Sequence, residues 1–340
     1  MGKEVLRRYP GSEVIFVTGG RKIESDILKG AGFDQVSISV EGLKGKGWGK
    51  ALKGVFKLPL GFYQAVSIIR RFSPDLVLGV GGYSSGPVCL GARMMGVPTA
   101  IHEQNSFPGI TNRLLSRIVD RVFISFKESR GNFPGGLLFF TGDPVREEFT
   151  DPKGLPPRDE KIFTILVTGG SQGAVAINKI FVSALEILKA RGKEPRVIHH
   201  AGSHDFDRVL REYREKGLHG DVRPFIQDMV WAYHQADIFI GRAGAGTIFE
   251  LALMGKPSIL IPYPYAANRH QDTNAKTLSG IGGAVMIHQD KLTGEGLAEM
   301  LMGFMDDREA LKKMGEKARR AGKPDAARVI VDRLEEMILS

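Results

Sequence analysis

The stretch IFTILVTGGSQGA, residues 162–174, decides the fold. Its first seven residues are apolar or β-branched, which predicts a buried strand, and the glycines that follow predict a tight loop before the helical periodicity at 176–191. Glycines between a strand and a helix let backbone N–H groups approach a ligand, and the helix N-terminus favours negative charge. Ser171 adds a hydroxyl donor to this loop. The stretch therefore predicts an α/β fold with a loop that binds an anionic group.

The pattern of apolar strand, glycine turn and amphipathic helix repeats along the 340 residues. Such alternation predicts parallel sheets with helices on both faces. The segment 151–161 is rich in proline and charge and is the best candidate for a linker. We therefore expect two Rossmann-like domains that face each other across a cleft, 1–150 and 162–325, and a helix at 326–340 that packs back on the first. Strands are predicted at 14–18, 76–80, 99–102, 122–125, 138–141, 162–168, 196–200, 238–241 and 258–262.

The two predicted domains share a motif but open differently. The run FVTGG at 16–20 resembles LVTGG at 166–170. However, the second domain opens with a strand and glycine loop, whereas the first opens with a helix at 3–8. Because a doubly wound domain begins with a strand, we expect a strand and a phosphate-facing loop to be missing before Met1. The sequence does not distinguish three explanations for this difference: a miscalled start codon, a truncated gene, or a first domain that is built differently.

The composition limits the class of protein. With 42% hydrophobic and 25% charged residues, the chain has an ordinary globular mixture, which argues against bulk disorder. The single cysteine, Cys89, excludes a disulfide framework, and its apolar neighbours indicate a buried residue rather than a nucleophile. No apolar run reaches the roughly 20 residues that span a bilayer. Scattered histidines and one cysteine do not form a metal-binding pattern, so we expect no metal and no cofactor.

A basic and apolar segment at 42–74 contributes much of the net charge of +9. It contains seven Lys or Arg and no acidic residue. Basic residues attract anionic headgroups, and exposed apolar residues enter the membrane interface. A core helix with a solvated basic face is the alternative, whereas no nucleic-acid motif is recognised. The predicted membrane-facing patch consists of Lys46, Trp48, Lys50, Lys53, Phe56 and Lys57.

Two polar loops follow strands of the second domain. In GRAGAGTIFE, residues 241–250, the backbone N–H groups of 245–247 open a helix, and Glu250 lies one turn further with a carboxylate suited to two ribose hydroxyls. In HQDTNA, residues 270–275, Gln271 is an amide that can bind sugar hydroxyls. Both loops can also be read as ordinary helix caps.

Three polar motifs end strands of the first domain, where ligands bind in open α/β sheets. They are GVGGYSSGP at 79–87, HEQN at 102–105 and GDPVR at 142–146. Arg146 can pair with an anion across the cleft or cap a helix. The pattern G-x-S-x-G of a nucleophile elbow occurs twice in the chain, at 82–86 and 169–173, so it carries little weight for a serine hydrolase.

Together these motifs resemble those of the MurG family, in order and approximate spacing, over essentially the whole chain. The motifs are 79–87, 102–105, 142–146, 169–174, 244–250 and 270–275. The resemblance implies a GT-B fold and an inverting transfer of GlcNAc from UDP-GlcNAc to the C4 hydroxyl of MurNAc in undecaprenyl-pyrophosphoryl-MurNAc-pentapeptide. This step converts lipid I to lipid II in peptidoglycan synthesis.

The resemblance also implies roles for individual residues. Donor binding falls to Asn105, Arg146 and Ser171, uracil contact to the backbone of Ile226, the diphosphate and ribose to Ala245, Gly246, Thr247 and Glu250, and the GlcNAc hydroxyls to Gln271. The stretch 43–62 resembles the family's membrane-docking face. The implied location is therefore peripheral, on the cytoplasmic face of the cell membrane, with UDP-GlcNAc, lipid I, an anionic membrane surface and cell-wall synthesis proteins as partners.

The chain departs from the family pattern at two places. Asp143 stands where the family usually has Asn before the proline. The GGTGGH-type loop near the family's N-terminus, whose His is a candidate base in the family, is absent. The catalytic base is therefore left unassigned, with Glu103 as a candidate in this sequence. Two alternatives stay open: a UDP-GlcNAc 2-epimerase on the same fold, and a truncated transferase that binds the nucleotide sugar without turnover.

Overall fold

The computed structural model describes the chain apart from residues 21–24, 26–27, 41–47, 134–136, 152–153, 171–172 and 340. The side chains of residues 48–58 also lie outside this description. The chain forms two compact units. Unit 1 comprises Met1–Pro144 and Asp325–Ser340, and unit 2 comprises Val145–Pro324.

Unit 2 is built on a six-stranded parallel sheet with the strand order β12-β11-β10-β7-β8-β9. The strands are β7 (Thr164–Thr168), β8 (Arg196–His200), β9 (Asp221–Arg223), β10 (Ile238–Gly241), β11 (Ser258–Leu260) and β12 (Ala284–Met286). From β7 the chain first adds β8 and β9 on one side and then β10 to β12 on the other. The order therefore reverses at β7 and β10, and open α/β sheets bind ligands at such a switch point.

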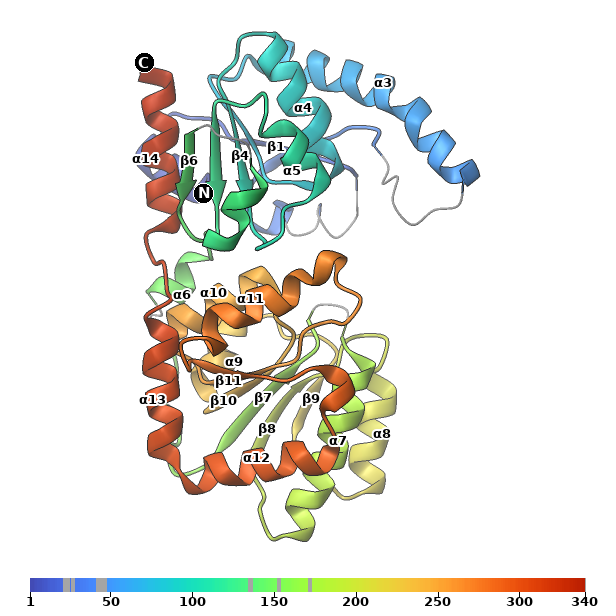
Figure 1. The fold of residues 1–340 in the computed structure, drawn as a ribbon, viewed down its shortest axis with the longest axis vertical. Helices are drawn as coiled ribbons and strands as arrows, with labels where there is room; N and C mark the ends of the chain where they lie inside the picture. The colour runs from blue at the N-terminus through green and yellow to red at the C-terminus, as the bar shows by residue number, and fades with distance from the viewer. Residues whose placement is uncertain are drawn as a thin grey trace. The chain divides into compact units, whose positions relative to one another are not determined.

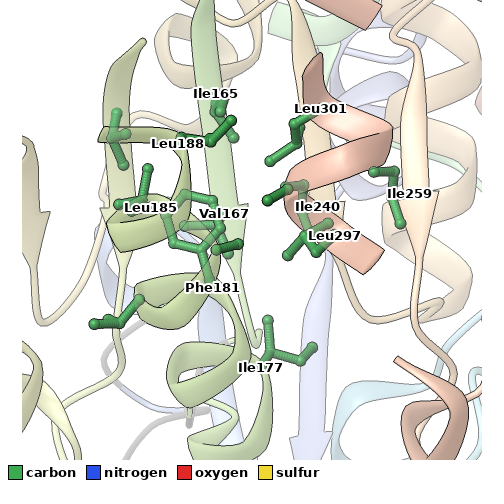
Figure 2. Close-up of a cluster of buried hydrophobic side chains, with 14 of the residues drawn as sticks. Ile165, Val167, Ile177, Phe181, Leu185, Leu188, Ile240, Ile259, Leu297 and Leu301 are labelled. Atoms are coloured by element: carbon green, nitrogen blue, oxygen red, sulfur yellow. The ribbon is translucent and has the colours of Figure 1, made fainter. Parts of the chain in front are cut away.

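Helices cover both faces of this sheet (Figure 1). The helices of unit 2 are α6 (Glu147–Thr150), α7 (Val175–Ala190), α8 (Phe206–Glu215), α9 (Met229–Gln235), α10 (Ala245–Met254), α11 (His270–Ser279), α12 (Gly294–Asp306) and α13 (Arg308–Arg319). Side chains alternate between the faces of a strand, so β7 sends Ile165 and Val167 to the face that carries α7 and α12. There they join Phe181 and Leu297 in one buried cluster (Figure 2).

The opposite face of the same sheet packs against α9. The ring of Phe239 from β10 lies 5.6 Å from the ring of Tyr233 in α9, measured between centroids. Phe149 of α6 meets Tyr233 edge-on at 5.8 Å. Tyr233 is therefore fixed on two sides by aromatic rings.

Unit 1 contains a four-stranded parallel sheet, ordered β3-β4-β5-β6, and a two-stranded sheet, β1-β2. The strands are β1 (Ile15–Thr18), β2 (Asp34–Ser37), β3 (Val77–Gly79), β4 (Thr99–Glu103), β5 (Arg121–Ile124) and β6 (Leu137–Phe140). The helices are α1 (Gly2–Arg8), α3 (Trp48–Phe72), α4 (Gly82–Met94), α5 (Ile110–Leu115) and α14 (Ala326–Leu339). Both sheets are parallel, as the alternating pattern predicts.

The last helix, α14, belongs to unit 1. Its Ile330 and Leu334 pack against Ala100 and Phe123 of the four-stranded sheet. At the surface, the guanidinium of Arg8 lies 2.6 Å from a carboxylate oxygen of Asp332. The chain thus leaves unit 1, completes unit 2 and returns to cover the first sheet.

Three strands were not predicted from the sequence: β2, β9 and β12. Each lies at an edge of its sheet. Edge strands are short and partly exposed, and these have three or four residues without a long apolar run. The apolar signal that identifies central strands is therefore weak in them.

Cys89 is fully buried among Ile101, Leu115 and Val122, as its apolar neighbours predict. Burial raises the pKa of its thiol to about 12, so the thiol stays protonated and unreactive at neutral pH. Within the described ranges, no helix has the length and hydropathy needed to cross a bilayer.

Candidate functional site

A pocket of about 220 Å³ opens at the carboxyl ends of the unit 2 strands. Thr168 ends β7 and His200 ends β8, while Phe225 follows β9 and Arg242 follows β10. The pocket is lined by Arg146, Thr168, Gly170, His200, Phe225, Ile226, Gln227, Met229, Tyr233, Phe239, Arg242, Thr247 and Glu250. Four of the residues proposed from the sequence, Arg146, Ile226, Thr247 and Glu250, are therefore brought together.

Glu250 is held in place by Tyr233, whose hydroxyl donates a hydrogen bond to Glu250 Oε2 at 3.2 Å. Burial raises the pKa of Glu250, and the positive charge of Arg146 and the hydrogen bond from Tyr233 oppose this rise. Glu250 Oε1 has no hydrogen-bond partner within the described part of the chain. The carboxylate thus presents an acceptor to the pocket.

Arg146 enters the pocket from the start of α6. It occupies the N-cap position of this short helix, and its guanidinium lies 5.1 Å from the ring centre of Phe149. Phe149 is buried, so the guanidinium lies over an anchored ring. A fixed positive charge near Glu250 suits a ligand that carries hydroxyls and phosphates.

The glycine loop after β7 is ordered by Thr168, whose Oγ1 accepts a hydrogen bond from the backbone N–H of Gly170 at 3.0 Å. Gly170 and Gly173 have φ values of +86° and +78°, which favour glycine. A Cβ at Gly173 would also lie 2.4 Å from the Ala201 carbonyl oxygen. The predicted donor residue Ser171 lies outside the described residues.

The start of α10 offers backbone N–H groups. Gly244 is its N-cap and makes no side-chain capping hydrogen bond, so the first turn has no side chain that competes with a ligand. A Cβ built at Gly246 would meet nothing within 4 Å, which leaves open space beside this turn. A phosphate group can bind such a helix start. Binding of the diphosphate therefore stays a proposal for the residues of this first turn, Ala245, Gly246 and Thr247.

Gln271 and Asn274 both hold backbone groups of the loops around the site. Gln271 Oε1 accepts hydrogen bonds from the N–H of Tyr263 at 2.9 Å and from the N–H of Ala243 at 3.3 Å. Asn274 Nδ2 donates to the Ala243 carbonyl at 3.2 Å. Gln271 does not line the pocket, although its amide N–H₂ group remains a donor that suits a sugar hydroxyl.

Arg242 and Tyr233 were missed by the sequence reasoning. Arg242 lines the pocket while its guanidinium donates to the carbonyls of Ile261 and Pro262, both at 3.1 Å, and to Gln289 Oε1 at 2.7 Å. Arg242 lies inside a motif that was recognised, so its position directly after a strand was an available signal. Tyr233 has only the periodicity of a helix core residue, and nothing local distinguishes it.

The structure gives Glu103, the weak candidate for the base, a different role. It is only 2% exposed. Its Oε1 accepts from the N–H of Asn105 at 2.9 Å, and its Oε2 accepts from Asn112 Nδ2 at 2.8 Å and from the N–H of Gly109 at 3.2 Å. A buried carboxylate with both oxygens occupied braces the loop 104–109 and is poorly placed to accept a substrate proton.

Asn105, the predicted donor-binding residue of unit 1, follows the end of β4. Its backbone is fixed by Glu103, and its side chain is half-buried. His102 of the same strand lies 3.2 Å from the Gly142 carbonyl oxygen through its Nε2, and burial lowers its pKa to about 4. Strand β4 and the loop after β6 are therefore joined by a neutral histidine.

The predicted membrane patch falls largely outside the described side chains. Lys46 lies outside the described residues, and Trp48, Lys50, Lys53, Phe56 and Lys57 belong to α3, where only the helix is described. Further along α3, Leu60 and Tyr63 are exposed, as are Met94 of α4 and Ile110 and Leu114 of α5. Helix α4 packs against both α3 and α5. Unit 1 therefore exposes apolar side chains on three neighbouring helices.

Comparisons with known proteins agree with this architecture. The Glycosyltransferase family 28 N-terminal domain matches residues 4–124, and the Glycosyltransferase family 28 C-terminal domain matches residues 164–330. A protein of Syntrophus aciditrophicus is 44% identical over 99% of this chain and 94% of its own length. A protein of Myxococcus xanthus is 42% identical over 98% of this chain and 87% of its own. Both are named UDP-N-acetylglucosamine--N-acetylmuramyl-(pentapeptide) pyrophosphoryl-undecaprenol N-acetylglucosamine transferase.

The chain belongs to the MurG family. The crystal structure of Acinetobacter baumannii MurG is 30% identical, with a TM-score of 0.78 over 98% of this chain and 93% of that one. The predicted α/β fold of the GT-B type is confirmed. A UDP-GlcNAc 2-epimerase from Neisseria meningitidis has a TM-score of 0.67 at 15% identity, over 97% of this chain and 94% of its own, which is a likeness of fold alone. The epimerase alternative therefore has no support beyond that shared fold.

Proposed function

We propose that this MurG-family chain transfers GlcNAc from UDP-GlcNAc to the lipid-linked MurNAc-pentapeptide, the reaction for which its relatives are named. The observation that supports this most directly is the unit 2 pocket. There a carboxylate, two arginines and an uncapped helix start surround one cavity at the switch point of a parallel sheet. These are the groups that a ribose and a diphosphate require.

The proposed donor complex uses each part of the pocket. The ribose hydroxyls donate to Glu250, and the diphosphate binds the N–H groups of 245–247 with the help of Arg146. The uracil ring lies beside Phe225 and the backbone of Ile226. The remaining positions proposed to bind the donor are Asn105 and Ser171, with Gln271 for the GlcNAc hydroxyls.

The proposed chemistry is a single displacement. The C4 hydroxyl of the acceptor attacks the anomeric carbon of GlcNAc, the bond from this carbon to the phosphate oxygen breaks, and UDP leaves with the electron pair. The leaving diphosphate gains negative charge, which the N–H groups at the start of α10 and the nearby arginines stabilise. We propose that these groups act without a metal or cofactor. A general base, not assigned to a residue, takes the proton of the C4 hydroxyl.

The acceptor carries a long lipid, so the protein must work at a membrane surface. We propose that the exposed apolar side chains of α3, α4 and α5, together with the basic segment 42–74, dock on the anionic cytoplasmic face of the cell membrane as a peripheral contact. Cell-wall synthesis proteins are further proposed partners at that surface.

The test is transfer of labelled GlcNAc from UDP-GlcNAc to a lipid I analogue by this chain. We expect a product with the mobility of lipid II and the release of UDP. Binding of UDP by calorimetry without any transfer would instead support the alternative of a nucleotide-sugar-binding protein.

A further inference from the structure

His200 lines the same pocket but has no role in the donor complex described so far. It ends β8, is 4% exposed, and lies beside Phe225 and Ile226 in the cavity wall. The imidazole meets the ring of Phe225 edge-on, with centroids 5.6 Å apart and an interplanar angle of 89°. The ring is thus fixed at the end of the pocket that the proposal gives to the nucleotide base.

The hydrogen bonds of Thr168 determine which nitrogen of His200 carries the proton. Thr168 Oγ1 accepts from the N–H of Gly170 at 3.0 Å, and it lies 3.0 Å from His200 Nδ1. Nδ1 is the only other partner of this hydroxyl within the described residues, and we assign the hydroxyl hydrogen to it because that hydrogen would otherwise have no acceptor there. Nδ1 is therefore an acceptor, and the ring proton resides on Nε2.

His200 Nε2 is buried and has no hydrogen-bond partner within the described chain. The Pro224 carbonyl lies near enough to oppose the lowering of the histidine pKa, but not in hydrogen-bonding geometry. Burial dominates and lowers that pKa, so the imidazole is neutral at pH 7. A buried donor without a partner is unfavourable in the free protein and is available to a ligand.

The adjacent His199 provides a comparison within the same strand. It faces the other side of the sheet, with Nδ1 3.0 Å from the Tyr213 hydroxyl and Nε2 3.1 Å from Asn178 Oδ1. Both of its nitrogens are satisfied by the protein, so His199 ties β8 to the helices. Only His200 retains a donor, and this residue lies in the pocket.

We infer that His200 reads the nucleotide base: its Nε2–H donates a hydrogen bond to a ring carbonyl of uracil. This inference rests on the proposed nucleotide site of unit 2. A neutral donor beside Phe225 suits a flat, uncharged ring with carbonyl oxygens. The charged diphosphate instead has arginines and the start of α10.

Two substitutions separate the two nitrogens of His200. In His200→Asn the shorter amide keeps a partner for Thr168 at the position of Nδ1 but does not reach the position of Nε2. In His200→Gln the longer amide N–H₂ restores a donor there. Calorimetry with UDP should show affinity about 10-fold weaker for His200→Asn and within about 3-fold of the unsubstituted protein for His200→Gln.

Ligand variants identify what His200 contacts. Uridine 5′-monophosphate should lose the same factor as UDP in His200→Asn, whereas a contact to the second phosphate would spare it and overturn the inference. In the unsubstituted protein, one of the two analogues 2-thio-UDP and 4-thio-UDP should bind more weakly than UDP, because sulfur is a poor acceptor. In His200→Asn this analogue should bind as well as UDP does, since the hydrogen bond is already lost. If the loss of affinity from either analogue simply added to the loss from His200→Asn, the inference would be overturned.

The substitution Glu250→Ala distinguishes a failure of the inference about His200 from a failure of the proposed nucleotide site. If Glu250→Ala weakens UDP binding but His200→Asn does not, the site stands and the role of His200 is wrong. If neither substitution changes UDP binding, the proposed site itself is wrong. The thio-analogues require no substitution, so a variant that fails to fold leaves that arm of the test intact.

Discussion

Unit 1 and unit 2 contain the same strand end, Val-Thr-Gly-Gly, and both fold it in the same way. In unit 1, Thr18 Oγ1 accepts from the N–H of Gly20 at 3.3 Å and lies 3.2 Å from Ser37 Oγ on the neighbouring parallel strand. Thr18 and Ser37 are register partners of β1 and β2. The φ of Gly20 is +79°.

In unit 2 the equivalent threonine is Thr168, which binds the N–H of Gly170 and lies beside His200, its register partner on β8. The local geometry is shared, but the surroundings differ. β1 belongs to a two-stranded sheet with half-exposed residues, whereas β7 is buried in the middle of six strands. The side chain of Ser37 has a single polar atom, and this atom contacts the threonine. The side chain of His200 has two nitrogens, so one contacts the threonine and the other is available to a ligand. The motif fixes a turn, and the neighbouring strand decides whether that turn forms part of a site.

The largest expected effect concerns the unit that we propose to bind the nucleotide. Glu250→Ala should weaken UDP binding roughly 100-fold, because two hydrogen bonds to a charged group are lost. Isothermal calorimetry measures this, and Glu128→Ala, at an exposed glutamate of unit 1, is the control. Unchanged affinity in Glu250→Ala would remove Glu250 from the site.

Both units contain a buried histidine with a lowered pKa, so both should lose stability in acid. The pKa is about 4 for His102 in unit 1 and about 3 for His199 in unit 2. In the unfolded chain each histidine has a pKa near 6.5 and takes up a proton that the folded state refuses. The contribution of these histidines to the free energy of unfolding should therefore be constant above about pH 7. Between pH 6.5 and 5 it should fall by about 2 kcal/mol for each histidine.

The two tryptophans allow this loss to be measured in each unit separately, since Trp48 lies in unit 1 and Trp231 in unit 2. Trp48→Phe and Trp231→Phe each leave a single reporter for urea unfolding. Adding His102→Gln should flatten the pH dependence of unit 1 alone. If both units remained equally stable at pH 5 and pH 7, this account of the histidines would be wrong.

The two threonines test the comparison directly. Thr168→Val should weaken UDP binding about 10-fold, because it frees the Gly170 amide and releases the ring of His200. Thr18→Val removes the same hydroxyl from the equivalent turn of unit 1 and should change UDP affinity by less than about 2-fold. Equal effects from both substitutions would mean that the turn of unit 2 has no special part in binding. A thermal scan should confirm that both variants are folded.

The smallest effect is expected at the surface. Tyr63 of unit 1 is 72% exposed, and Tyr265 of unit 2 is 81% exposed. If unit 1 docks on the membrane, Tyr63→Asp should reduce co-sedimentation with anionic liposomes about 3-fold. The substitution removes an aromatic side chain and adds a negative charge, which the anionic lipids repel. Tyr265→Asp adds the same charge elsewhere and should leave it unchanged. Equal losses in the two variants would point to net charge rather than a docking face.

Much of the fold was readable from the sequence. Central strands such as β7 and β10 are continuous apolar runs followed by glycine, because a strand covered on both faces has no solvent-facing positions. The edge strands β2, β9 and β12 were missed, since they are short and their residues are partly exposed. Of the site, Arg146, Ile226, Thr247 and Glu250 could be named because each belongs to a short motif that resembles the family.

The sequence by itself thus determined the alternating architecture, the family and the motif residues, because these depend on local order and periodicity. Only the tertiary structure decided that Tyr233 holds Glu250, that Glu103 braces a loop, and that His200 rather than His199 keeps an unpaired donor in the pocket. Each of these depends on which groups from distant segments lie within hydrogen-bonding distance. His199 and His200 are the same residue type at adjacent positions, so the sequence alone does not distinguish their roles. The alternation of side chains along a β-strand places them on opposite faces of the sheet, where they have different neighbours.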